Sequence, residues 1–215
     1  MVHTDRYQSM KEAAMGWFDW LGRLMGGKAT TGGGQAASAA PAPPAATSED
    51  WQALCTAVGE ALAPDDVDGL WDEVHQALTQ PQQYYNRFAD DLPNRGIHAP
   101  EHVTPWLALV DGLQRRDQNF ELDWKLDMGD AIWALRALKT VQQQAVPLEP
   151  LAASKALSHD ALLEVGDYLR TRGLSLVSFD IQSDSYPLSV LETGAVAPLQ
   201  ALAQRVGSKV VDLAN

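Results

Sequence analysis

Apolar and polar positions divide the chain into two unequal parts. Residues 26–48 are almost entirely glycine, alanine, proline, serine and threonine, with no large aliphatic or aromatic side chain. Because such a segment cannot bury enough apolar surface to offset the entropy lost on ordering, we expect a flexible linker. Residues 49–215 carry apolar side chains throughout and are long enough to enclose one core. They therefore predict a single globular domain.

A short segment before the linker has a different pattern. Apolar residues between positions 10 and 24 recur at alternating spacings of four and three, which predicts an amphipathic helix within residues 1–25. The segment is too short and too often interrupted by charge to span a bilayer, and it lacks the apolar run of a signal peptide. Three roles remain open: binding a partner through side chains such as Trp17, Phe18 and Leu21, lying on a membrane surface, or folding back onto the domain.

The globular part opens with helical spacing. Apolar residues from Trp51 to Leu62 lie on one face of a helix that Thr47 or Ser48 would cap. Further helices are predicted after Pro64, over residues 82–91, and from residue 104, where a Thr-Pro pair suits an N-cap followed by the first helical residue. These helices form an N-terminal helical layer.

After Asp117 the spacing changes from helical to alternating. Phe120, Leu122 and Trp124 alternate with charged residues, which predicts a half-buried strand. A helix capped by Asp127 is expected to run to about residue 143. The elements expected after it are a helix over residues 158–173, strands over 174–181 and 186–191, a helix over 198–206 and a strand over 209–213.

This order of elements predicts an α+β fold. The helical layer precedes a four-stranded antiparallel sheet with helices on one face. If the extra helix within residues 127–173 is set aside, the order strand, helix, strand, strand, helix, strand matches the split β-α-β arrangement of ferredoxin-like folds. We therefore expect a ferredoxin-like sheet.

Composition narrows the range of functions. The chain has 215 residues, a formal net charge of −12 and one cysteine. A single cysteine excludes a disulfide framework and a cysteine-rich zinc module, and it favours a reducing, cytoplasmic setting. The first 48 residues hold four of the 16 basic and three of the 28 acidic residues, so the domain carries 12 basic and 25 acidic residues, a net charge of −13.

The acidic residues are concentrated near the start of the domain. No lysine or arginine occurs between Lys28 and Arg87, whereas eight acidic residues do. Such a surface repels phosphate backbones, which argues against nucleic-acid binding, and it attracts basic proteins. It suits an inhibitor or immunity-type protein that presents carboxylates to a nuclease, although acidic residues also serve solubility and helix dipoles. We expect a non-enzymatic interaction protein without a cofactor, and its candidate partner-binding residues are Glu60, Asp65, Asp66, Asp68, Asp72 and Glu73.

Candidate catalytic groups are few. The sequence contains no P-loop, nucleophile elbow, dinucleotide-binding glycine motif or Cys-x-x-Cys. His98, Glu101 and His102 spell H-x-x-E-H, but Pro100 inside that turn predicts a loop rather than a zinc-binding helix. Cys55 lies in an apolar stripe and is expected to be a small buried hydrophobe.

The alternative to an interaction role is a metal-dependent hydrolase. Asp123 lies on the first predicted strand, and Asp180 and Asp184 flank the turn between two later strands. If those strands are adjacent, the three carboxylates could gather into a metal or acid–base site.

Two short motifs carry a resemblance to a known family. The strand residues Leu122-Asp123-Trp124-Lys125 and the turn Ser183-Asp184-Ser185-Tyr186-Pro187-Leu188, with Ile132-Trp133 between them, resemble a family of uncharacterised bacterial domains of unknown function. The resemblance covers about the last 110 residues of the chain. It implies a bacterial cytosolic setting and assigns no activity, so it gives no role to the motif residues Asp123, Trp124, Lys125, Asp184 and Tyr186.

Overall fold

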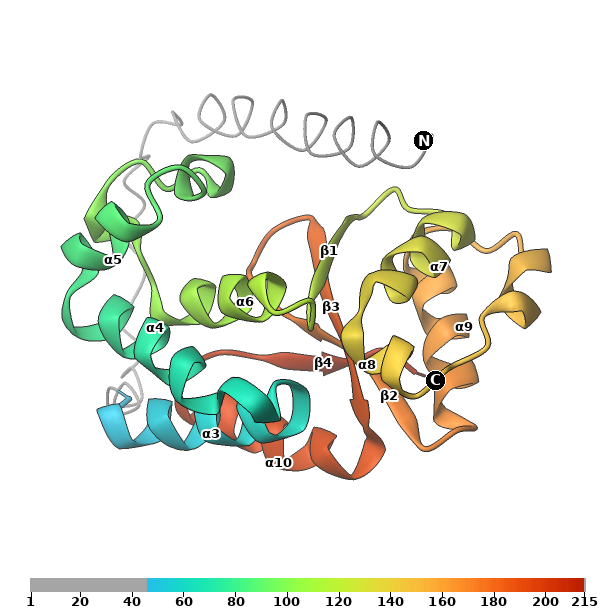
Figure 1. The fold of residues 1–215 in the computed structure, drawn as a ribbon. Helices are drawn as coiled ribbons and strands as arrows, with labels where there is room; N and C mark the ends of the chain where they lie inside the picture. Colours follow the sequence, from blue (N-terminus) through green and yellow to red (C-terminus); the bar gives the residue numbers. More distant parts are fainter. Residues whose placement is uncertain (1–45, 215) are drawn as a thin grey trace, which may run out of the picture.

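A four-stranded sheet crosses the middle of the domain, with helices on either side of it (Figure 1). The computed structural model describes residues 46–214, so the helix expected within residues 1–25, including Trp17, Phe18 and Leu21, lies outside the described residues. The strands are β1 (Phe120–Asp123), β2 (Leu174–Phe179), β3 (Ser185–Glu192) and β4 (Val210–Asp212). Their order is β1-β3-β2-β4, and all neighbouring pairs are antiparallel.

The N-terminal helical layer forms as the apolar spacing predicts. The Thr47 hydroxyl accepts a hydrogen bond from the Asp50 N–H, and the Asp50 carboxylate accepts one from the Thr47 N–H, so a capping box starts the first helix. The Thr104 hydroxyl accepts from the Leu107 N–H and starts the fourth. The helices are α3 (Ser48–Leu62), α4 (Val67–Thr79), α5 (Pro81–Arg87) and α6 (Pro105–Arg115), with 3-10 turns at Pro64–Asp66, Leu92–Arg95 and Pro100–His102.

Three more helices lie between β1 and β2, and a fourth lies between β3 and β4. They are α7 (Met128–Ala137), α8 (Lys139–Gln143), α9 (Ser158–Arg170) and α10 (Thr193–Arg205), and a 3-10 turn at Glu149–Ala153 precedes α9. The single helix expected over residues 127–143 is interrupted at Leu138, where ψ is 126°. Helix α10 begins at Thr193 rather than at the predicted Pro198, so this proline lies inside the helix instead of at its start. Among residues 46–214, no helix is long and apolar enough to cross a membrane.

Both faces of the sheet are buried. Val177 and Phe179 of β2 belong to one core, which they share with α3, α4, α6 and α10, whereas Leu174 and Leu176 belong to a second core with α7 and α9. All six residues of β2 are buried. The prediction of helices on one face only is therefore wrong. Apolar residues at both even and odd positions of β2 are typical of a strand that is covered on both sides.

The α+β class is confirmed, and the first three strands form a split β-α-β unit. Strands β1 and β2 lie on either side of β3, and α7, α8 and α9 connect them. Strand β4 lies beside β2, at the edge opposite β1. A ferredoxin-like fold has its last strand beside the first, so that topology is not established. The order of elements along the chain does not decide the question, because either edge of the three-stranded unit can accept a further strand.

Candidate functional site

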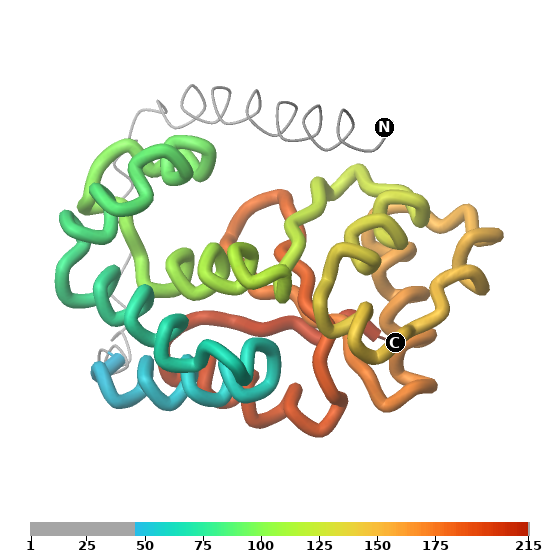
Figure 2. The backbone as a smooth tube through the Cα atoms, in the orientation of Figure 1, coloured from blue at the N-terminus to red at the C-terminus, as the bar shows by residue number. Residues whose placement is uncertain are grey.

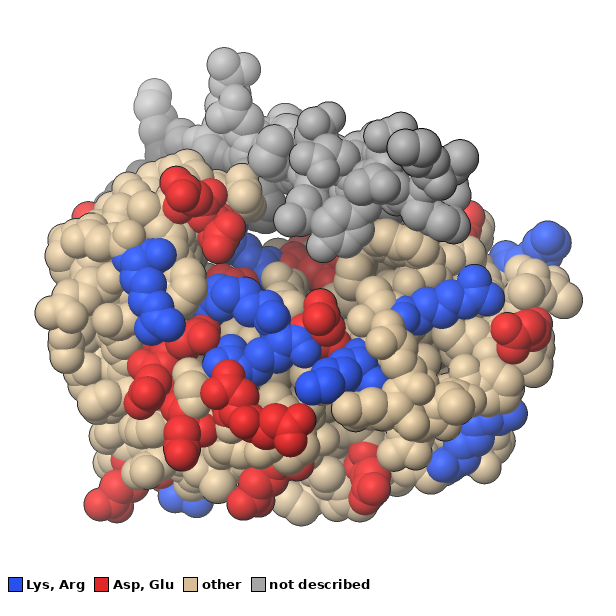
Figure 3. Space-filling view, viewed as in Figure 1, with Lys and Arg blue, Asp and Glu red and all other residues tan. Residues whose placement is uncertain are grey.

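Half of the acidic residues in the cation-free interval are paired within the domain. Glu49, Glu60, Asp68 and Asp72 are exposed and form no ion pair with any residue in the range 46–214. Figure 3 shows acidic side chains gathered where α3 and α4 lie in Figure 1, next to basic side chains at the centre of the face. The ion pairs of the other four acids are Asp50 with Arg205, Asp65 with Lys139, Asp66 with Arg116, and Glu73 with both Arg115 and Arg116.

Glu73 is buried between α4 and α6. It is 6% exposed, and Arg115 and Arg116 donate hydrogen bonds to its two carboxylate oxygens. The Arg115 guanidinium also lies 4.1 Å from the centre of the Phe88 ring, which shields the pair further. Glu73 was expected to bind a partner, but it is not accessible to one. Its position next to buried Val74 carries it into the interface with α6, so it leaves the set of candidate partner-binding residues.

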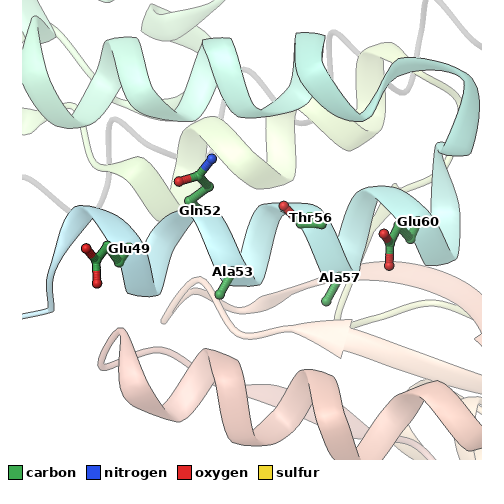
Figure 4. Close-up of a pocket in the computed structure, with 6 residues that line it drawn as sticks. All are labelled: Glu49, Gln52, Ala53, Thr56, Ala57 and Glu60. Atoms are coloured by element: carbon green, nitrogen blue, oxygen red, sulfur yellow. The ribbon is translucent and has the colours of Figure 1, made fainter.

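The outward stripe of α3 lines a shallow groove. Figure 4 shows Ala53 and Ala57 pointing toward α10, with Glu49 near one end of the stripe and Glu60 near the other. Side chains three and four positions apart share one face of a helix, so the groove follows the helix axis. Among residues 46–214, its lining is Glu49, Gln52, Ala53, Thr56, Ala57 and Glu60.

The two family motifs meet at one corner of the sheet. In the register of β1 and β3, Leu122 is opposite Tyr186 and Asp123 is opposite Ser185. The Asp123 carboxylate accepts a hydrogen bond from the Lys125 N–H at 2.8 Å, within the turn that leads from β1 to α7. The motifs therefore come together although about 60 residues separate them in the sequence.

The segment before α9 completes this corner. Leu157 forms a backbone bridge with Asp127, and the Ser158 N–H donates to the Leu126 carbonyl at 2.8 Å. The His159 ring stacks on the Tyr186 ring, with centroids 6.2 Å apart. We name residues 123–127, 157–159 and 184–186 the motif corner. Its exposed large apolar side chains are Trp124 and Leu157.

The three aspartates of the hydrolase alternative do not gather. The Asp180 carboxylate accepts a hydrogen bond from the Gln182 N–H at 2.8 Å, just as Asp123 accepts one from Lys125, so each serves its own turn. In the part of the chain that the structure describes, no group of three or more His, Cys, Asp or Glu side chains is placed to hold a metal ion. The structure therefore does not bring Asp123, Asp180 and Asp184 together as ligands.

The structure also places two other groups that the sequence offers as candidates, the Cys55 thiol and the H-x-x-E-H motif. Cys55 is fully buried in the core, and burial raises the pKa of its thiol to about 12, so the thiolate is absent at neutral pH. The prediction that Cys55 is a small buried hydrophobe is confirmed. His98, Glu101 and His102 are exposed at the 3-10 turn Pro100–His102, which confirms the predicted loop.

Arg95, Asp111 and Glu121 form a buried charge cluster that no motif or spacing in the sequence indicates. Arg95 donates hydrogen bonds to Asp111 of α6, to Gln114 of α6 and to Glu121 of β1, and the Ser185 hydroxyl donates to the same Glu121. The side chains of the three charged residues are 20% exposed or less. Burial raises the pKa of Asp111 in spite of the opposing charge of Arg95. Because Nε and both terminal nitrogens of Arg95 are engaged, the cluster ties the segment between α5 and α6 to the sheet edge.

The comparisons with known proteins agree with the motifs. Residues 50–214 match the family described as Domain of unknown function (DUF6630), so the match also takes in helices α3 to α6, beyond the last 110 residues that the motifs indicated. No curated protein and no solved structure matches the chain. The resemblance to a family of domains of unknown function is confirmed, and over residues 50–214 this chain belongs to the DUF6630 family.

Proposed function

We propose that this protein is a non-enzymatic interaction domain that binds a basic protein through exposed carboxylates of α3 and α4. We name Glu49, Glu60, Asp68 and Asp72 the acidic face. The observation that carries the proposal is that these four exposed carboxylates have no ion pair within the described domain. Unpaired surface charge of one sign attracts a partner of the opposite sign and raises its association rate.

The groove on α3 supports the proposal because it is lined by two carboxylates of the acidic face, one near each of its ends. Glu49 and Glu60 are about 16 Å apart along the helix, at the helical rise of about 1.5 Å per residue. Ala53 and Ala57 between them are small and half-buried on the side toward α10, so no bulky side chain stands between the two carboxylates. A partner helix or strand with basic side chains at that spacing would meet a carboxylate at each end. An acidic inhibitor or immunity-type protein would present such carboxylates where a nuclease accepts the phosphates of its substrate.

The test is reversal of the acidic face with a matched control. One full-length variant carries Glu49→Lys, Glu60→Lys, Asp68→Lys and Asp72→Lys. The control carries Asp90→Lys, Asp91→Lys, Glu101→Lys and Asp160→Lys, which change the net charge equally from exposed positions outside α3 and α4. The acidic-face set changes two first-turn acids, Glu49 of α3 and Asp68 of α4, and the control changes one, Asp160 of α9, so the thermal midpoint of both variants is measured alongside. The immobilised native chain and both variants are incubated with lysate of the source organism at about 50 mM and about 300 mM salt.

The expected result is one basic protein, identified by mass spectrometry, that the native chain and the control capture in roughly equimolar amount at low salt. The higher salt releases it, and the acidic-face variant does not capture it at either salt concentration. Equal capture by the acidic-face variant and the control, or no basic protein on the native chain, contradicts the proposal.

A further inference from the structure

The motif corner exposes apolar side chains that folding alone does not require. Trp124 is 42% exposed and Leu157 is 62% exposed, and these are the exposed large hydrophobic residues of the described chain. The backbone pairs between residues 126–127 and 157–158 hold the two loops together. Ser158, directly after Leu157, has a φ of 52°, an unfavourable conformation for a residue with a side chain. The backbone thus has an unfavourable conformation directly after Leu157, whose side chain remains at the surface.

We propose that residues 10–25, the amphipathic segment of the same chain, dock on the motif corner and cover Trp124 and Leu157. The apolar stripe of the segment includes Trp17, Phe18 and Leu21, which are of the size and kind that such a surface buries. This contact is separate from the acidic face, so the inference does not depend on the proposed function.

The length of the linker permits docking within one molecule. Roughly 20 residues lie between residue 25 and Ala46, the first described residue, and a flexible chain of that length has a root-mean-square span of about 25 Å. A domain of about 170 residues has a radius of about 20 Å. Fully extended, the same linker spans about 70 Å, which exceeds the roughly 60 Å path over such a surface from one side to the other, so the segment can reach the motif corner. Its effective concentration there is in the millimolar range, so a contact of modest affinity is well populated.

Charge favours the segment over a second copy of the domain. The cations Lys11 and Arg23 balance the acids Glu12 and Asp19, so residues 10–25 carry no net charge. The domain carries −13, by the count given above, and two domains brought together at their motif corners would repel each other. A neutral apolar segment approaches the same surface without that cost.

Disulfide trapping in the full chain tests the contact. Gly22→Cys places a thiol next to Leu21, and Lys155→Cys places one at an exposed position close to Leu157. The matched control pairs Gly22→Cys with Gln83→Cys, an exposed position on α5, at the end of the molecule where α3 begins (Figure 1). A freely moving segment would therefore reach position 83 at least as readily as position 155. Cys55 stays silent in these variants because it is fully buried.

We expect the intramolecular bond between positions 22 and 155 to form at least about tenfold faster than the bond between positions 22 and 83. Adding Trp124→Ser and Leu157→Ser, both at exposed positions, should reduce the first rate to the second while circular dichroism and the thermal midpoint stay unchanged. Equal rates for the two pairs overturn the proposal. So does a disulfide-linked dimer as the main product, which would point to a second copy, or a rate that the two serines leave unchanged.

Discussion

The C-terminal end of the chain passes so close to α9 that Gly166 has no room for a side chain. A Cβ atom at Gly166 would lie 1.4 Å from the carbonyl oxygen of Leu213, whereas ordinary contact begins at 3.4 Å. Figure 2 shows this end of the chain beside the helix. The difference between the two distances means that Gly166→Ala forces residues 213–214 away from α9 by about 2 Å, because the obstacle is backbone and cannot rotate aside.

That displacement removes two interactions of Leu213. Its N–H donates to the Leu176 carbonyl at 2.9 Å, and its side chain is 2% exposed in the core with α7 and α9. Losing the hydrogen bond costs about 0.5–1.5 kcal/mol, and exposing a buried leucine costs about 1.5–3 kcal/mol. We therefore expect Gly166→Ala to lower the free energy of unfolding by about 2–4 kcal/mol, a large share of the roughly 5–15 kcal/mol typical of a domain.

Gly194→Ala is the matched control, since it makes the same substitution in a helix without an obstacle. Nothing lies within 4 Å of a Cβ added at Gly194 in α10, so alanine should stabilise the protein by about 0.5–1 kcal/mol through its helix propensity. Urea unfolding of the full chain, followed by circular dichroism, measures both variants. A loss smaller than about 1 kcal/mol for Gly166→Ala, or a change of the same sign in both variants, refutes the close crossing.

Three further predictions concern charges and caps. Arg95→Met leaves Asp111 and Glu121 buried without their cation, so urea unfolding at pH 7 should show a loss of about 3–5 kcal/mol, which shrinks toward acidic pH as Asp111, whose pKa burial raises, takes up a proton. Because the pKa of Asp111 is raised above its value of 3.8, the native state binds more protons than the unfolded state. Its contribution to stability is therefore complete below 3.8 and is lost as the pH rises through the raised pKa, and Asp111→Asn should abolish this slope in a pH series. Thr47→Ala removes the capping box of α3 and should cost about 1 kcal/mol in thermal unfolding, whereas Thr56→Ala, at an exposed position inside the same helix, should cost nothing.

Local chemistry made the starts of α3, α6 and α7 predictable from the sequence. Thr47, Thr104 and Asp127 each precede an apolar helical stripe, and each caps its helix in the structure. The alternating pattern at β1 misled in one respect, because it placed Trp124 in the strand, whereas the strand ends at Asp123 and Trp124 lies exposed in the turn. The alternation of apolar and polar residues does not indicate where the chain leaves the sheet.

Features that depend on distant partners could not be derived from spacing. Glu73 belongs to an acidic run that resembles a solvated face, and the two arginines that neutralise it at the end of α6, Arg115 and Arg116, are about 40 residues away. Arg95 and Glu121 are separated by 26 positions and carry no common motif. The placement of β4 beside β2 likewise depends on a pairing that local residues do not encode. For the motif corner, the sequence shows the two motifs, and the register of β1 and β3 brings them together.

The acidic face and the motif corner lie on opposite sides of the sheet, which makes their independence testable. Helices α3 and α4 belong to the core with Val177 and Phe179, whereas α7 and α9 belong to the other core. Perturbations at distant sites without shared contacts are additive. The four charge reversals of the acidic face should therefore leave the rate of disulfide formation between positions 22 and 155 unchanged at moderate salt. A rate that changes severalfold would mean that residues 10–25 lie on α3 and α4 instead, and that the segment competes with the basic partner for one surface.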